Sequence, residues 1–206
     1  SGWSRETMLL VNNVLLVSST TMILIGTLYP LLADVLDLGK ISVGPPYFSF
    51  FFVPITSLMM LFLGFAGFTR WKKSDNAMML SRGALPSIVS LTLALLLPAM
   101  MAEPLSWQTY SLTAVVTLFL SLWVITMTME DVLLKSSGSV KKLKALTGSY
   151  WGMVLAHSGL AVCVIGVGLS SAYDMQRDVR MVPGDFVEVA DYEFQFLGVE
   201  RVDGPN

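Results

Sequence analysis

The sequence has little cysteine, little histidine and little charge. Its single cysteine, Cys163, rules out an internal disulfide framework, a CxxC redox pair and a cysteine-based zinc site. No glycine-rich nucleotide fingerprint, P-loop or HExxH motif occurs, and only 14% of the residues are charged. Because 54% are hydrophobic and the mean hydropathy is +0.67, the composition indicates an integral membrane protein.

Five stretches are apolar enough to cross a bilayer, which takes about 20 helical residues each. They lie at about 8–32, 48–68, 84–101, 109–129 and 150–171. Pro86 and Pro98 lie near the ends of the third stretch, and we place them at helix ends because proline disrupts a helix interior. The sequence thus predicts an all-α integral membrane protein, with a transmembrane helical domain over residues 1–172.

The charges between these stretches predict how the chain is oriented. With the N-terminus in the cytoplasm, nine of the 13 Lys and Arg residues and four of the 15 acids lie on the cytoplasmic side. Because cytoplasmic loops are enriched in Lys and Arg, this distribution favours five spans with the C-terminus outside. Membrane topology explains the basic loops, so no nucleic-acid partner is expected.

The tail over residues 173–206 has a different pattern. Short strand-like segments at 179–182, 186–190 and 191–196 are separated by a turn at Pro183-Gly184-Asp185. Two or three strands are too few for an independent core. We therefore expect the beginning of a small extracytoplasmic β domain that is truncated in this chain.

The fifth stretch, Tyr150–Ser171, carries His157, the only histidine. A side chain that can ionise or bind a metal is costly to bury in an apolar span without a partner. The residues alone leave three partners open: a hydrogen bond to another helix, a cofactor, or a proton relay. Small residues near it in sequence would let a bulky group approach the backbone; they are Gly152, Ala156, Ser158, Gly159 and Ala161.

Several segments, in this order and spacing, resemble the CcmF family, the large heme-lyase subunit of bacterial cytochrome c maturation. The segments are Arg5-Glu6 followed by LLVNNVLLV (9–17), GTLYPLL (26–32), GKISVGPPYF (39–48), AHSGLAVCVIGVGLSSAYD (156–174) and DVRMVPGD (178–185). Within them, we interpret Gly44-Pro45-Pro46-Tyr47-Phe48 as a rigid turn that leads into a helix. The resemblance covers nearly the whole chain and corresponds to the C-terminal portion of the family.

The resemblance implies a function, a cofactor and a site. The family attaches heme to CxxCH motifs of apocytochrome c on the periplasmic side. It also holds a heme b within the membrane through two histidines on different spans, and this heme reduces the arriving heme. By its position in the motif, His157 matches the second of those iron ligands. No catalytic residue of this chain is implied.

The resemblance also implies partners and a location. These are the N-terminal part of CcmF with the other ligand, the heme carrier CcmE, apocytochrome c and its CcmH- and CcmI-like thiol-handling partners. The location would be the bacterial inner membrane, or the mitochondrial inner membrane for a split organellar form. Two alternatives are open: a non-catalytic scaffold or channel subunit with a structural histidine, and the paralogue dedicated to nitrite reductase.

Overall fold

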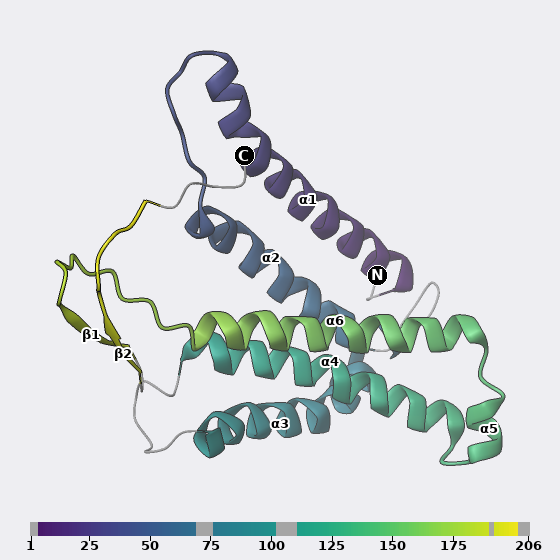
Figure 1. Ribbon diagram of the computed structural model, residues 1–206. Helices are drawn as coiled ribbons and strands as arrows, with labels where there is room; N and C mark the ends of the chain where they lie inside the picture. The colour runs from purple at the N-terminus through teal and green to yellow at the C-terminus, as the bar shows by residue number, and fades with distance from the viewer. Residues whose placement is uncertain (1–3, 69–75, 102–110, 190–191, 202–206) are drawn as a thin grey trace. The chain divides into compact units, whose positions relative to one another are not determined.

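The computed structural model describes residues 4–68, 76–101, 111–189 and 192–201 (Figure 1). The elements are α1 (Arg5–Val35), α2 (Pro45–Gly64), the 3-10 helix η1 (Ala66–Phe68), α3 (Asn76–Met101), α4 (Leu112–Ser136), α5 (Val140–Lys144), α6 (Gly148–Ala172), β1 (Phe186–Val189) and β2 (Tyr192–Gln195). Five helices of this described part are long and apolar enough to cross a membrane. The predicted fold class, five membrane helices followed by a small β element, is confirmed.

The first two helices begin where local chemistry favours a helix start. The Ser4 side chain caps α1 by accepting a hydrogen bond from the Thr7 amide at 3.2 Å. Pro45 and Pro46 occupy the first positions of α2, where a missing N–H has no consequence for helix hydrogen bonds. A helix starts here as the sequence predicts, but four residues of the predicted turn, Pro45–Phe48, already belong to α2 and only Gly44 precedes it.

The placement of the α3 prolines at helix ends was wrong. Because α3 already begins at Asn76, Pro86 lies well inside it, and Pro98 also lies within its last turns. The preceding Ala, Met, Leu and Arg residues are good helix formers and extend the helix beyond the apolar stretch. Membrane helices tolerate internal proline because neighbouring helices and local adjustments satisfy the freed backbone groups.

The core of the helical unit, Ser1–Leu169, is centred on α4. Half of the most apolar window of α4 is buried, a larger share than in the other four membrane-length helices. The core cluster consists of Met60, Leu120, Trp123, Val124, Met127 and Ala161. Four of these six residues belong to α4, so this helix organises the packing of the others.

Close contacts join α4 to α2 and α3. The Trp123 indole N–H donates to the Leu61 carbonyl at 3.1 Å, and its ring lies so close to Gly64 that an added Cβ would collide with it. The hydroxyls of Ser90 on α3 and Thr126 on α4 are hydrogen-bonded at 3.0 Å. These are the small-residue and polar contacts that join helices in a membrane.

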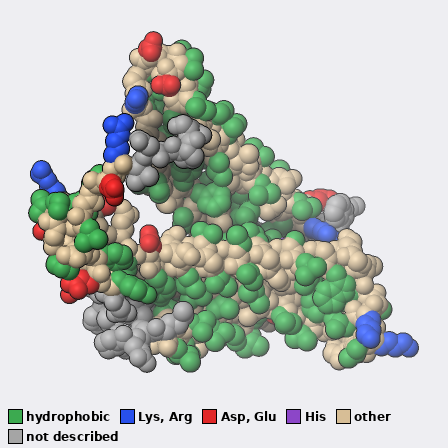
Figure 2. Space-filling view, in the orientation of Figure 1, with side chains coloured by type: hydrophobic (Ala, Val, Ile, Leu, Met, Phe, Trp, Pro, Cys, Tyr) green, Lys and Arg blue, Asp and Glu red, His purple; other side chains and the backbone are tan. Residues whose placement is uncertain are grey.

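Much of the helical surface is apolar. Only 11% of the apolar window is buried in α1 and in α2, and only 6% in α6. Figure 2 shows hydrophobic side chains spread over the outer faces of the helices. Lipid or further membrane helices can cover a surface of this kind without leaving a polar group unsatisfied.

The second unit, Ser170–Asn206, contains one antiparallel hairpin of β1 and β2. Val187 pairs with Phe194 in its register. The predicted turn is present, with Gly184 at φ 100° and the Asp185 carboxylate accepting from the Val182 amide at 2.8 Å. Residues 179–182 form no strand, which corrects that part of the prediction: Val182 bonds within the turn instead. Residues 190–191 lie outside the described part.

Candidate functional site

His157 lies in the first half of α6, and its side chain is partly exposed. Within the described residues, the imidazole makes no hydrogen bond. The interhelical hydrogen bond that the sequence left open is therefore not made inside this part of the chain. Both ring nitrogens keep their bonding capacity, which a ligand or another segment could use.

The face of α6 that carries His157 is the face that packs on α4. At about 100° per residue, Tyr150, His157 and Ala161 fall on one side of the helix. Ala161 is fully buried in the core cluster. Farther along this face, a Cβ added at Gly168 would collide with the side chain of Thr117. Figure 1 shows α6 running beside α4, as these contacts require.

The opposite face of α6 is a stripe of small residues. Its exposed members are Gly152, Ala156, Gly159, Cys163, Gly166 and Ser170. A Cβ added at Gly152, Gly159 or Gly166 would meet no atom within 4 Å. Most small residues expected to flank His157 therefore lie away from it, whereas Ala161 shares its face and is occupied in packing against α4.

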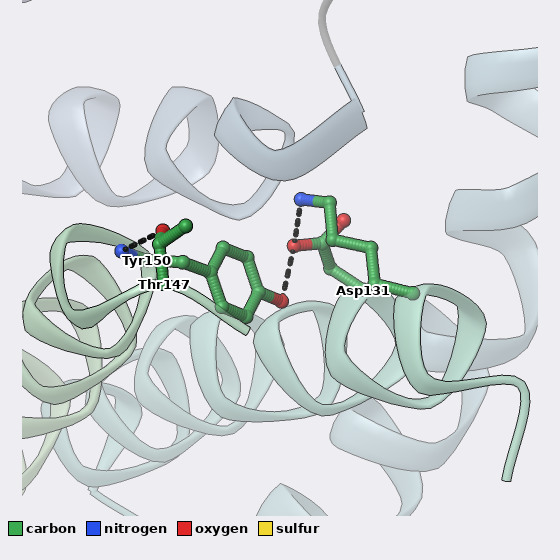
Figure 3. A network of polar contacts seen from close by, with 4 residues as sticks. Asp131, Thr147 and Tyr150 are labelled. Carbon is green, nitrogen blue, oxygen red and sulfur yellow. Dashed lines mark hydrogen bonds and ion pairs between the residues drawn. The ribbon is translucent and has the colours of Figure 1, made fainter. Parts of the chain in front are cut away.

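A polar network lies at the N-terminal end of α6, about two helical turns before His157. The Tyr150 hydroxyl donates to the Asp131 carboxylate on α4 at 2.7 Å (Figure 3). The Lys135 ammonium bonds the same carboxylate oxygen at 2.7 Å and lies 4.4 Å from the centre of the Tyr150 ring. Asp131 is only 4% exposed, so its charge is satisfied by these two partners rather than by water.

The connection between α2 and α3 also reaches this network. A Cβ added at Gly67, in η1, would come within 2.7 Å of the Asp131 carboxyl carbon. Glu130, the residue before Asp131 on α4, forms an ion pair with Arg82 on α3 at 3.6 Å. The end of α4 is therefore where η1, α3 and α6 are joined by charged and polar side chains.

The predicted fourth stretch ends at residue 129 and leaves Asp131 outside it, so the sequence did not reveal this network. The spacing of Asp131 and Lys135 by four residues is a recognisable helical ion pair, and α4 extends past both. The partner on α6, Tyr150, has no signal in a single sequence. Tertiary packing brings the two helices together, and only the structure shows which residues meet.

Residues other than His157 form no metal-binding cluster in the described part of the chain. No group of three or more His, Cys, Asp or Glu residues there could hold a metal ion. Met60 and Met127 are fully buried in the core cluster, so they serve in packing. The basic residues Arg70, Lys72 and Lys73, used to predict the orientation, lie outside the described residues.

The fold defines a multi-pass membrane protein, and its relatives are proteins of cytochrome c biogenesis. The chain is 43% identical over 206 residues to the cytochrome c-type biogenesis protein CcmF of Pseudomonas aeruginosa, and 38% identical over 204 residues to CcmF of Escherichia coli. Each alignment covers 99% of this chain and 30% of the relative. The chain is thus a homologue of CcmF, which confirms the resemblance found in its sequence.

Further comparisons show how far this assignment to CcmF relatives extends. The cytochrome c-type biogenesis protein NrfE of Haemophilus influenzae is 29% identical over 203 residues, covering 98% of this chain and 30% of that protein. No family model matches the chain, and no solved structure matches it. The chain spans about 30% of the length of its CcmF relatives, consistent with a C-terminal portion, and its homologues support a role in cytochrome c maturation.

Proposed function

We propose that this chain is the C-terminal membrane portion of a heme lyase that attaches heme to the CxxCH motifs of apocytochrome c on the periplasmic side. In this proposal His157 supplies one axial ligand to an intramembrane heme b. The single observation that carries it is the state of His157: a partly exposed imidazole in a membrane-length helix, with no hydrogen bond within the described residues. The homology to CcmF supports the same reading.

The residues present suit one half of a heme site. A neutral imidazole is a strong axial ligand, and its free ring nitrogens permit coordination without breaking an existing bond. When bound, heme b would supply one-electron chemistry for reducing the arriving heme iron. This chain contributes the imidazole and an apolar surrounding that excludes water. With one histidine in the chain, the second histidine ligand has to come from another segment.

The proposed partners follow from this division. The N-terminal portion of CcmF would supply the other ligand, and the carrier CcmE would deliver heme. Apocytochrome c would be presented by thiol-handling partners of the CcmH and CcmI kind. The proposed location is the bacterial inner membrane, with the N-terminus cytoplasmic and the C-terminal β element periplasmic, since that orientation keeps the Lys- and Arg-rich loops inside.

A reduced-minus-oxidised optical spectrum of the full-length protein in its complex tests the assignment of His157. His157→Ala should abolish the heme b signal or convert it to a high-spin form, because one of two strong axial ligands is lost. His157→Met should retain a low-spin heme with a higher midpoint potential, since methionine is a weaker donor. Ser158→Ala, one residue away, is the matched control and should leave the spectrum unchanged.

The rival function is a non-catalytic scaffold or channel subunit with a structural histidine. Heme content separates the two functions. A purified complex with stoichiometric heme that is lost with His157 supports the lyase, whereas a colourless complex that still assembles supports the scaffold. The nitrite-reductase paralogue is tested by which cytochromes fail to mature in a strain lacking the protein.

A further inference from the structure

A specific hydrogen bond joins α4 and α6, and we call it the polar tie. Among the described residues, the Tyr150–Asp131 hydrogen bond is the one hydrogen bond that joins these two helices. Elsewhere on α6, Ala161 lies in the core cluster with Leu160 and Val164 packed against it, and Gly168 lies against the Thr117 side chain. Packing contacts of this kind define rotation and axial position less sharply than a directional bond does.

The carboxylate at this tie is held from several sides. Lys135 bonds the same oxygen that accepts from Tyr150, and the hydrogen bond to a charged acceptor is of the stronger kind. Gly67 in η1 lies against the carboxyl group so closely that no side chain would fit between them. Asp131 therefore has little freedom to turn away, and its position fixes the Tyr150 hydroxyl.

The polar tie is made by Tyr150, which lies on the same face of α6 as His157. Tyr150 and His157 are separated by seven residues, about 10 Å along the axis, and differ by about 20° in direction around it. A rotation or slide of α6 that follows loss of the tie would move the imidazole by a similar angle or distance. Ligand sites tolerate displacements of only about 0.5 Å and 10–20° from their productive geometry.

We propose that Asp131 is a positioning residue for His157, acting through the hydroxyl of Tyr150 to set the rotation and axial position of α6. This inference rests on the proposed function, in which His157 is an axial ligand. Asp131 and Tyr150 do not touch the bound group. They hold the helix that presents the ligand, as outer-shell partners of metal ligands do.

Two readouts on the full-length protein in its complex test this proposal. The first is heme-independent: with other cysteines replaced, the distance between spin labels at Leu133→Cys on α4 and Leu155→Cys on α6, both exposed positions, reports the position of α6 against α4. The second is the midpoint potential of the heme b signal with its low-spin electron paramagnetic resonance spectrum. Tyr150→Phe keeps the ring and removes the hydroxyl. Tyr47→Phe is the matched control, because it removes the hydroxyl bond to the Met22 carbonyl at the α1–α2 contact.

Tyr150→Phe should change the spin-label distance and shift the midpoint potential and low-spin spectrum, whereas Tyr47→Phe should change neither readout. Asp131→Asn keeps an oxygen that accepts from Tyr150, so it should retain more of both readouts than Asp131→Leu. Unchanged readouts in Tyr150→Phe would overturn the proposal. A changed spin-label distance with an unchanged heme signal would also overturn it, because the hydrogen bond would then be structural only.

The failure of this inference differs from the failure of the proposed function. If His157→Ala leaves the heme signal unchanged, His157 is not a ligand, whatever the spin-label distances show. If His157→Ala removes the signal and Tyr150→Phe leaves it unchanged, the ligand assignment stands and the positioning role of Asp131 is rejected.

Discussion

Two membrane-length helices, α4 and α6, have the same length and nearly the same apolarity but opposite surroundings. Each has 25 residues and a mean hydropathy of 2.0 in its most apolar window. Half of that window is buried in α4, against 6% in α6. Hydropathy therefore identifies a span without telling whether it forms the centre of a bundle or its edge. The two helices differ in their side chains: α4 carries the buried Trp123, and α6 carries an exposed stripe of small residues.

Removing the Trp123 side chain should have the largest effect on stability. Trp123 is 3% exposed, and truncation to alanine opens a cavity and leaves the Leu61 carbonyl without its donor. We expect a loss of about 3 kcal/mol in the free energy of unfolding. Chemical denaturation in detergent measures it, with Leu155→Ala on α6 as the matched change, since Leu155 is 70% exposed.

Leu155→Ala tests whether α6 contributes less to stability than α4 does. In this chain Leu155→Ala should cost less than about 0.5 kcal/mol, because an exposed side chain loses few contacts. If the rest of the full-length protein covers α6, the same change should cost more there. Equal losses for Trp123→Ala and Leu155→Ala in this chain would contradict the assignment of α4 as its centre.

Breaking the polar tie at the end of α4 should have the next largest effect. Asp131→Leu removes the carboxylate that satisfies both Tyr150 and Lys135. The loss should be about 2 kcal/mol, because hydrogen bonds to a charged group exceed those between neutral groups. Thermal unfolding in detergent measures the loss, and Asp185→Leu in the separate hairpin unit is the control that should leave the melting of the helical unit unchanged.

A pair of glycine substitutions should change the free energy of unfolding with opposite sign on the two helical surfaces. Gly64→Ala places a methyl group against the Trp123 indole, which should cost about 1–3 kcal/mol through overpacking. Gly159→Ala meets no atom and should stabilise α6 by about 0.5 kcal/mol through helix propensity. Denaturation midpoints of the two variants provide the comparison. A destabilising Gly159→Ala would show that α6 is covered.

The Arg82–Glu130 ion pair should contribute least. Its side chains are 37% and 27% exposed and the atoms are 3.6 Å apart, so solvent screens the attraction. Replacing Glu130 by glutamine should change the free energy of unfolding by less than about 1 kcal/mol. A salt titration of the unfolding midpoint checks this value, and a loss as large as that of Asp131→Leu would mean that the two acids act as one network.

The five spans could be predicted from sequence because bilayer thickness and apolarity set a simple length requirement. Their ends could not, since α3 begins eight residues before the predicted stretch and includes Pro86. The penalty for proline applies to an isolated helix, and packing against α4 offsets it. The short helix α5 lies in a loop whose polar residues gave no apolar periodicity to predict it.

The candidate histidine could be found from its sequence, but its surroundings could not. His157 is conspicuous because it is the only histidine in the sequence and lies in an apolar span. Which face it occupies depends on how α6 packs, and Tyr150, Ala161 and Gly168 settle this in the structure. The pairing of Asp131 with Tyr150 joins residues on different helices, which a local pattern cannot reveal. The orientation in the membrane stays a prediction.

The most direct measurement replaces the imidazole and then returns it. In the full-length protein, His157→Gly removes the proposed ligand and leaves space at the helix for a small base. We expect the low-spin heme b spectrum to be lost in His157→Gly and to return when imidazole is added. A low-spin spectrum that is unchanged by His157→Gly without added imidazole would contradict the assignment of His157 as an axial ligand.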